Sequence, residues 1–238
     1  MDENKFKCEL QNFNINVNNH QLEQFNIYYS FLIEWNKKVN LTAITDKKEV
    51  YVKHFFDSIS PSFLFDFTKC LSICDIGAGA GFPSIPLLII FPNLKVTIVD
   101  SLQKRILFLD ELLQKLNISN VKLIHGRAED IGKKKEYREN FDVVIARAVA
   151  RTNVLAEYCL PLCKLSGHFI ALKGQYTDEE LSEAKKAIHI LGGKHKQKYS
   201  FHLPIEQSDR TILVIQKIKK TPKLYPRKAG TPVKKPIK

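Results

Sequence analysis

The sequence contains no hydrophobic run long enough to cross a membrane and no secretory signal. Its longest apolar stretch, 85–91, is interrupted by Pro86 and followed by Pro92, whereas a membrane-spanning helix needs about 20 consecutive apolar residues. Residues 1–10 mix acidic and basic side chains, unlike the cationic and then apolar pattern of a signal peptide. These absences predict a cytoplasmic protein that makes no membrane contacts.

Cysteine is too scarce and too irregularly spaced for a disulfide framework or a metal site. The number of cysteines is odd, and two pairs have the spacing C-x3-C without a histidine at zinc-finger spacing. Two of the cysteines flank a predicted strand and two lie at helical spacing, so we expect reduced cysteines in the core and no metal. The five cysteines are Cys8, Cys70, Cys74, Cys159 and Cys163.

Acidic residues are missing altogether from the end of the sequence. The chain has a net charge of +12, and residues 217–238 contain nine Lys or Arg and no acid, together with spaced prolines. This composition disfavours helix and central strand, so residues 218–238 are predicted to be a basic, proline-rich tail. Such a tail can attract a polyanion such as RNA or can be a solvated, disordered segment, and charge alone favours neither interpretation.

The length of 238 residues suits one α/β domain with an appendage, and residues 1–68 are predicted to be an N-terminal helical extension. Apolar residues that step by three and four, as on one face of a helix, are Leu22, Phe25, Tyr29, Leu32 and Trp35. A second helix is predicted after Thr45, because Asp46 and Glu49 have capping-box spacing. Its apolar face would contain Val52, Phe55 and Ile59.

In residues 69–217, short β-branched runs alternate with amphipathic helical patterns. The predicted strands are 71–76, 95–99, 121–125, 141–146, 168–172, 199–203 and 211–217. The predicted helices are 84–91, 102–117, 151–164 and 177–191. Alternation of this kind implies a parallel sheet with right-handed crossovers. Because no helix separates the last two strands, the prediction is a Rossmann-like, doubly wound, seven-stranded sheet that ends in an antiparallel hairpin.

The most informative stretch is a glycine-rich turn between the first strand and the following helix. Gly77, Gly79 and Gly81 alternate with alanines, and Pro83 stands at the start of the helix. Glycines let the backbone turn tightly and approach a bound nucleotide without Cβ clashes. Turns of this type lie at the carboxyl end of a strand, where open α/β sheets bind ligands.

A dinucleotide cofactor fits this turn poorly. The fingerprint G-x-G-x-x-G would place its third glycine at Phe82 or Ser84, depending on the register. Asp75, just before the turn, is unfavourable for a pyrophosphate but suits a ligand with a cationic amino-acid group. S-adenosylmethionine carries an ammonium and a sulfonium and no phosphate, so it is the predicted cofactor.

Further polar residues follow the other predicted strands and should share the same edge of the sheet. Asp100 ends the second strand, where it can accept hydrogen bonds from ribose hydroxyls or can cap the next helix. The loop 126–130 can flank an adenine, Arg147 puts a cation near the reaction centre, and Lys173 ends the fifth strand. Phe82 can contact the cofactor or belong to the core.

Motifs of several methyl-transfer classes are absent. The place after the fourth strand reads Ala-Arg-Ala-Val at 146–149, not the Asn/Asp-Pro-Pro-aromatic tetrad of enzymes that methylate exocyclic amino groups. Cys159 and Cys163 fall in a helical pattern and not in the Pro-Cys context of a cytosine carbon-5 methyltransferase. A ring nitrogen such as guanine N7 has a free lone pair, so methyl transfer to it needs positioning and no obligatory base.

Seven stretches resemble the bacterial small-subunit ribosomal RNA guanine-N7 methyltransferase family (RsmG), also called glucose-inhibited division protein B. They run through nearly the whole chain and are WNKKVNLT (35–42), HFFDS (54–58), DIGAGAGFP (75–83), DSLQKR (100–105), RAVA (147–150), ALKG (171–174) and YPRKAGTP (225–232). Many methyltransferases share the glycine turn, whereas the first and last stretches are much more specific to this family.

The resemblance implies a class I methyltransferase that uses S-adenosylmethionine to methylate N7 of one guanine in 16S rRNA, in the loop near the decoding site. The implied partner is 16S rRNA or the 30S subunit, and DNA is not expected. The predicted cofactor-binding residues are Gly77, Gly79, Phe82, Asp100, Ala128, Glu129 and Arg147. The predicted RNA-facing residues are Lys104, Arg127, Lys173 and Arg227.

No residue is assigned as catalytic, and Arg147 is the best candidate through a positioning role. His54 and Asp57 match the family, and docking of the N-terminal helices is favoured for them over catalysis. Three other functions stay open from the sequence. They are a non-catalytic RNA-binding assembly factor that holds S-adenosylmethionine, a small-molecule methyltransferase and an NAD-dependent oxidoreductase.

Overall fold

The computed structural model describes residues 1–69, 71–147, 150–174, 176 and 178–238. Its strands are β1 (Ser72–Ile76), β2 (Lys95–Asp100), β3 (Val121–His125), β4 (Phe141–Arg147), β5 (Cys163–Lys173), β6 (Gly193–His202) and β7 (Asp209–Lys217). Its helices of seven or more residues are α1 (Glu3–Gln11), α2 (Asn19–Asn36), α5 (Ser84–Ile90), α6 (Gln103–Lys115), α8 (Thr152–Cys159) and α9 (Asp178–Ile190). Short helical elements are α3 (Lys47–Val50), the π-helical turn η1 (Tyr51–Phe56), α4 (Asp57–Ile59), the 3-10 turn η2 (Ser60–Phe63), α7 (Ala128–Ile131) and α10 (Thr231–Lys234).

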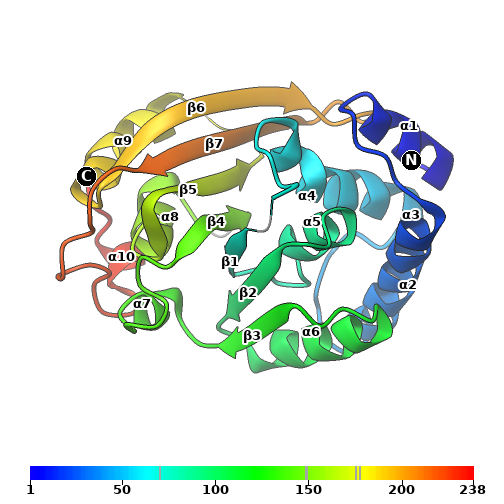
Figure 1. Cartoon of the computed structure of the whole chain (residues 1–238), viewed down its shortest axis with the longest axis horizontal. Helices are drawn as coiled ribbons and strands as arrows, with labels where there is room; N and C mark the ends of the chain where they lie inside the picture. Colours follow the sequence, from blue (N-terminus) through cyan, green and yellow to red (C-terminus); the bar gives the residue numbers. More distant parts are fainter. Residues whose placement is uncertain (70, 148–149, 175, 177) are drawn as a thin grey trace.

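All seven strands form one sheet in the order β3-β2-β1-β4-β5-β7-β6, with helices on both faces (Figure 1). The first five strands pair in parallel, whereas β7 is antiparallel to both β5 and β6. The predicted doubly wound sheet with an antiparallel hairpin is therefore confirmed. Because β1 pairs with β2 on one side and β4 on the other, the strand order reverses at β1, which is where such sheets bind ligands.

Three predicted elements near the end of the sheet were wrong in extent, and one of them, the strand 168–172, already begins at Cys163. The predicted helix 151–164 ends at Cys159, and Cys163 already belongs to β5. Pro161 stands between them, and a proline lacks the N–H that would continue a helix. Strand β6 begins at Gly193 and not at residue 199. The prediction missed its first half because this part of the edge strand is rich in lysine and lacks an apolar alternation.

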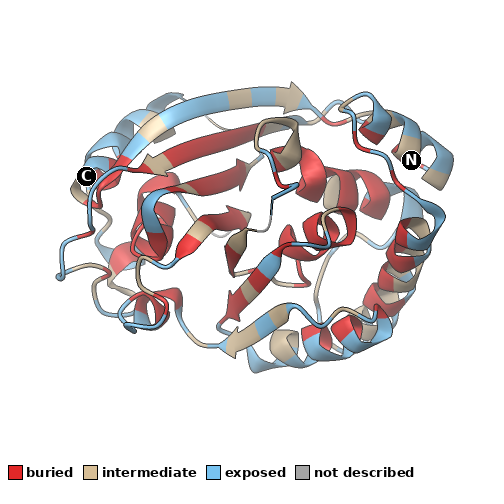
Figure 2. Ribbon diagram, in the orientation of Figure 1, coloured by how far each residue is buried: buried red, intermediate tan, exposed pale blue. Residues whose placement is uncertain are grey.

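The two predicted helices of the first zone are confirmed, and they cover one face of the sheet. In α2, Phe25 and Leu32 are fully buried, and Leu22, Tyr29 and Trp35 pack partly buried against the same core. The Asp46 side chain accepts a hydrogen bond from the Glu49 backbone N–H at 3.0 Å and so caps α3. The helical run continues through η1 and α4, where the predicted face of Val52, Phe55 and Ile59 is buried. Figure 2, coloured by burial, shows much of this helical run in red.

Of the four cysteines that the structure describes, three lie in the core as predicted. Cys74, Cys159 and Cys163 are free and buried, whereas Cys8 is free but exposed. Burial raises the pKa of the Cys163 thiol to about 12. Cys70 lies outside the described residues. Within the described ranges, no group of histidines, cysteines and acids has the geometry of a metal site, and no helix is long and apolar enough to cross a membrane.

Residues 218–238 are folded onto the body of the protein, so their interpretation as a disordered tail is wrong. Pro226 and Pro232 are buried, and the short helix α10 begins at Thr231. The Arg138 guanidinium donates hydrogen bonds to the backbone carbonyls of Thr221, Pro222 and Tyr225 at 2.8–3.2 Å. A segment without regular periodicity is thus held in place by polar contacts to its backbone. The boundaries of the three predicted zones stay a prediction.

Candidate functional site

The glycine-rich turn leaves β1 with three residues in the left-handed region of backbone space. The φ angles of Gly77, Gly79 and Gly81 are 72°, 60° and 95°, values that other L-residues adopt only with strain. A Cβ atom at Gly81 would lie 2.7 Å from Ile85 and 2.8 Å from the Tyr28 hydroxyl, whereas one at Gly79 would meet no atom within 4 Å. Gly81 is therefore required for packing, and Gly79 faces open space.

That open space is a cavity of about 600 Å³ at the carboxyl edge of the sheet. It extends from the glycine turn past the ends of β2 and β3 to the end of β4. The structure brings every predicted cofactor residue to this cavity, namely Gly77, Gly79, Phe82, Asp100, Ala128, Glu129 and Arg147. The parallel sheet explains this convergence, because residues that follow neighbouring parallel strands share one edge.

Asp100 holds the backbone before α6 but does not cap this helix, because the N-cap residue is Leu102 and no side chain caps it. Its carboxylate accepts from the backbone N–H of Leu102 at 2.9 Å, just before α6 begins at Gln103. It also accepts from the Gly79 N–H at 3.1 Å and from Arg105 at 3.3 Å, and it lines the cavity although it is only 2% exposed. The glycine turn and the acid are thus held against each other, and the contact to a ribose stays a prediction.

Asp75 is fully buried beside the cavity and is not among the residues that line it. Its Oδ2 accepts from the Ser84 N–H at 3.1 Å, while Oδ1 is a buried atom without a partner among the described residues. Burial raises the pKa of this carboxyl to about 7, against the opposing effects of the hydrogen bond from Ser84 and the charge of Arg147. An unpaired buried acceptor is costly, and the pairing of Asp75 with a cationic group of a ligand stays a prediction.

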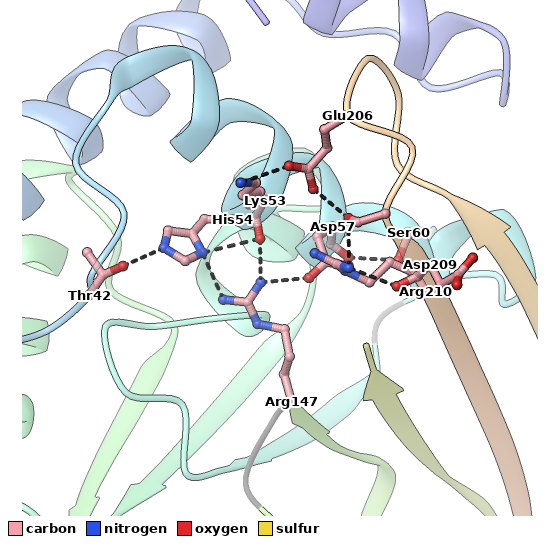
Figure 3. A network of polar contacts seen from close by, with 10 residues as sticks. Thr42, Lys53, His54, Asp57, Ser60, Arg147, Glu206, Asp209 and Arg210 are labelled. Atoms are coloured by element: carbon pink, nitrogen blue, oxygen red, sulfur yellow. Dashed lines mark hydrogen bonds and ion pairs between the residues drawn. The ribbon is translucent and has the colours of Figure 1, made fainter. Parts of the chain in front are cut away.

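The end of the cavity beside β4 is closed by an aromatic and cationic stack. The His54 ring lies on the Phe82 ring at a centroid distance of 4.6 Å, and the Arg147 guanidinium lies 4.8 Å from the centroid of Phe82. Arg147 also donates to the Lys53 carbonyl at 3.1 Å and to Asp57 Oδ2 at 2.9 Å (Figure 3). Arg147 therefore lines the cavity while the N-terminal helices fix its position.

Asp57 is buried between two guanidinium groups that come from different strands. Its Oδ1 accepts from Arg210 Nε at 3.1 Å on β7, opposite the contact with Arg147 from β4. The His54 Nε2 atom lies 2.8 Å from Thr42 Oγ1, and burial, aided by the Arg147 charge, lowers the pKa of His54 to about 3. Both residues join the N-terminal helices to the sheet, in agreement with the docking role favoured from the sequence.

The predicted RNA-facing residues are not all gathered at one place. Arg127 is exposed and lines the cavity, and Lys104 is exposed on α6 outside it. Lys173 lines a neighbouring cavity of about 300 Å³, where its Nζ lies 2.8 Å from both Glu180 and the Ala150 carbonyl. Arg227 is bound to the buried Glu157. RNA contact by these four residues stays a prediction, and the inward pairing of Arg227 argues against it there.

Sequence reasoning missed several cavity residues. Tyr158 on α8 and Val233 on α10 line the cavity, as does Thr42 from the loop after α2. No periodicity or spacing in the sequence connects Val233 with the glycine turn, because the contact depends on how residues 218–238 fold back. Arg105 belongs to one of the resembling stretches, and its ion pair with Asp100 gives it a place in the cavity wall.

Solved structures with low sequence identity share the fold. A putative sarcosine dimethylglycine methyltransferase from Galdieria sulphuraria matches with a TM-score of 0.53 and 11% identity, over 69% of this chain and 85% of that one. The TYW2 protein of M. jannaschii, solved in complex with AdoMet, matches with a TM-score of 0.56 and 16% identity, over 69% and 76%. These matches show the fold of the class I methyltransferases.

Relatives with high identity narrow this class. The model of a family described as rRNA small subunit methyltransferase G (GidB) matches residues 21–212. The ribosomal RNA small subunit methyltransferases G of Bacillus cereus (strain B4264) and Bacillus thuringiensis (strain Al Hakam) are each 59% identical over 237 residues, covering 100% of this chain and 99% of theirs. The chain belongs to the rRNA small subunit methyltransferase G family.

Proposed function

We propose that this enzyme transfers the methyl group of S-adenosylmethionine to N7 of one guanine in 16S rRNA, in the loop near the decoding site. The reaction takes place in the cytoplasm, and the substrate is the free rRNA or the assembled 30S subunit. Membership of the rRNA small subunit methyltransferase G family supports the rRNA substrate. The chemistry of the cavity supports the position of the methyl group.

The observation that carries the N7 assignment is the lack of an available base at the Arg147 end of the cavity. Among the described residues there, His54 has a pKa of about 3, so its neutral imidazole is too weak a base to take up a proton at neutral pH. The Asp57 carboxylate is occupied by Arg147 and Arg210. Guanine N7 has a lone pair and no proton to lose, so a site that positions the base without deprotonating it is sufficient.

The residues present fit S-adenosylmethionine, which supplies a methyl group on a sulfonium. Asp75 would compensate the ammonium of the cofactor, because one of its buried oxygens lacks a partner among the described residues. Asp100 would hold the ribose, and Ala128 and Glu129 would flank the adenine, since all three line the cavity. Arg147 would act as a positioning residue that closes the site beside Phe82.

The test is methyl transfer from labelled S-adenosylmethionine to 30S subunits and to free 16S rRNA that lack the native modification, followed by mapping of the label. We expect one N7-methylguanine near the decoding site. The sharpest control is an rRNA with 7-deazaguanine at that position, because it lacks only the accepting atom. Label on the 7-deaza substrate, or on an exocyclic group, would exclude N7 as the acceptor.

A pair of matched variants distinguishes the methyltransferase function from that of a non-catalytic assembly factor. Asp100→Asn alters a cavity residue at the end of β2, whereas Asp110→Asn alters an exposed acid on α6, the helix that follows. We expect methyl transfer to fall with the first variant and to stay unchanged with the second, with RNA binding kept in both. If the wild type binds S-adenosylmethionine and RNA but transfers no label, the assembly-factor function takes precedence. A saturable nicotinamide titration would instead favour an oxidoreductase.

A further inference from the structure

The 218–238 segment is anchored at two places by side chains from the body of the protein. The first anchor is Arg138, whose guanidinium bonds the carbonyls of residues 221, 222 and 225. Next to it, Glu139 accepts from the Thr221 backbone N–H at 2.7 Å. The Thr221 hydroxyl donates to the Leu191 carbonyl at 2.7 Å and is buried. The path of the chain after β7 is therefore fixed.

The second anchor is an ion pair between Arg227 and Glu157 of α8. The Glu157 carboxylate is 1% exposed and accepts from the Arg227 backbone N–H at 2.8 Å and from its guanidinium at 2.5–3.1 Å. The bond to Glu157 raises the pKa of Arg227. Contacts to both backbone and side chain leave little freedom for the residues just beyond Arg227.

Beyond the second anchor, the chain reaches the cofactor cavity. The Gly230 N–H donates to Glu129 Oε1 at 2.8 Å, and Glu129 lines the cavity. Gly230 has a φ of 81°, which favours glycine at this turn. Val233 on α10 is 60% exposed and lines the same cavity, together with Tyr158 of α8.

We propose that residues 230–233 are part of the cofactor site and form the wall of its adenine end. Val233 supplies an apolar contact for the adenine ring, and Gly230 is a positioning residue that holds the Glu129 carboxylate through its N–H. A carboxylate accepts several hydrogen bonds, so the bond from Gly230 leaves Glu129 able to accept from the exocyclic amino group of adenine. This inference rests on the proposed placement of the cofactor, with its adenine beside Ala128 and Glu129.

Two ligands and two variants test this wall by calorimetry. S-adenosylhomocysteine has both the adenosine and the amino-acid part, whereas 5′-methylthioadenosine has only the adenosine part. Val233→Asn should weaken both ligands by the same factor, about fivefold, as expected when one aliphatic contact becomes polar. Gly230→Ala should also weaken both, because its left-handed backbone disfavours a side chain and shifts the N–H from Glu129. Leu224→Asn is the matched control.

Leu224 is 71% exposed in the same segment and does not line the cavity, so its variant should bind both ligands like the wild type. Because Val233 is also largely exposed, its variant should keep the melting temperature of the wild type. Unchanged binding of both ligands by Val233→Asn would overturn the inference, as would a loss confined to S-adenosylhomocysteine. If the wild type itself binds neither ligand, the proposed cofactor site is wrong, and the inference that rests on it is wrong as well.

Discussion

Two regions far apart in the sequence enclose the cofactor cavity, and they are attached to the sheet in different ways. The N-terminal helices bury a continuous apolar surface that includes Phe6, Phe25 and Phe55, and they reach the cavity through His54. The 218–238 segment is attached mainly by Arg138 and by the buried Glu157, and it reaches the cavity through Val233. Apolar burial holds whole helices in place, whereas a segment without periodicity needs specific polar anchors.

The largest effect is expected where the N-terminal helices contact the site, from Arg147→Met. The side chains of Arg147 and Asp57 are 13% and 7% exposed, and breaking a buried pair costs about 3–5 kcal/mol. Because Arg210 still contacts Asp57, we expect a loss at the lower end of this range. The free energy of unfolding, measured in urea, should fall by about 3 kcal/mol. Adding Asp57→Asn to this variant should recover part of this loss, because it removes the buried charge.

The control for Arg147→Met is Lys198→Met, which breaks the exposed pair with Asp178. Exposed pairs contribute about 0–1 kcal/mol. Equal losses in the two variants would show that the pair beside the cavity does not dock the N-terminal helices.

At the other end of the cavity, Arg227→Gln should release the 218–238 segment without unfolding the sheet. It leaves the Glu157 carboxylate buried with only a backbone donor, at a local cost of about 2 kcal/mol. We expect chymotrypsin to cleave after Leu224 at least about tenfold faster, since local opening frees the backbone on both sides of this exposed residue. Lys228→Gln, the exposed neighbour, should leave cleavage unchanged, and equal protection in both variants contradicts the anchor.

Asp75→Asn tests the cavity itself, independently of the two regions that enclose it. With a pKa of about 7, Asp75 is partly protonated near neutral pH and can pair with a ligand ammonium only when ionised. Affinity for S-adenosylhomocysteine should therefore rise by about tenfold per pH unit below 7 and level off above it. In the variant this rise should disappear. Calorimetry in buffers of different ionisation enthalpy counts the proton released, and a wild-type affinity independent of pH contradicts the pairing.

The raised pKa of Asp75 also determines how the free energy of unfolding changes with pH. The folded-state pKa of Asp75, about 7, exceeds its ordinary value of 3.8, so its contribution to the free energy of unfolding falls as pH rises from about 4 to 7. His54 has the opposite effect, because its pKa is lowered from 6.5 to about 3 and its contribution is lost as pH falls through that range. Asp75→Asn should therefore reveal a stability that rises with pH.

The smallest effect concerns charge on the outer surface of the two regions. Lys219, Lys220 and Lys223 are exposed and form no ion pair with any described residue, whereas Lys5 and Lys47 near the other end are paired with Glu9 and Glu3. Replacing the first three by Gln should reduce the salt-dependence slope of rRNA binding by about 2. Replacing Lys5 and Lys47 should change it less, and an equal change would mean that the 218–238 segment has no special role in RNA binding.

Much of the fold and of the cavity could be predicted because the relevant signals are local. Alternating β-branched and helical patterns predicted the doubly wound sheet, and a parallel sheet then brings Gly79, Asp100 and Arg147 to one edge. Their contacts with the cofactor stay predictions. A proline at position 161 marked the end of α8, but the apolar residues around it obscured that signal.

Long-range polar pairing left no comparable signal. Asp57 and Arg147 are 90 residues apart, and Gly230 and Glu129 are 101 apart. A hydrogen bond between two such residues imposes no period on the sequence, so neither contact could be derived from spacing. The net positive charge of residues 217–238 suggested RNA binding and gave no sign that the segment is folded. The contacts that fix it come from its backbone and from Arg227.

The position of Asp57 depends on the number of residues in the π-helical turn η1. The Asp57 N–H bonds the carbonyl of Val52, five residues back, so this turn holds one residue more than an α-helical turn. Deleting one residue between 51 and 56 would restore α-helical pitch and rotate the rest of the helical run by about 100°. Asp57 would then leave the two guanidinium groups that it bridges. A single-residue deletion in this helix should therefore be less tolerated than most substitutions of its residues.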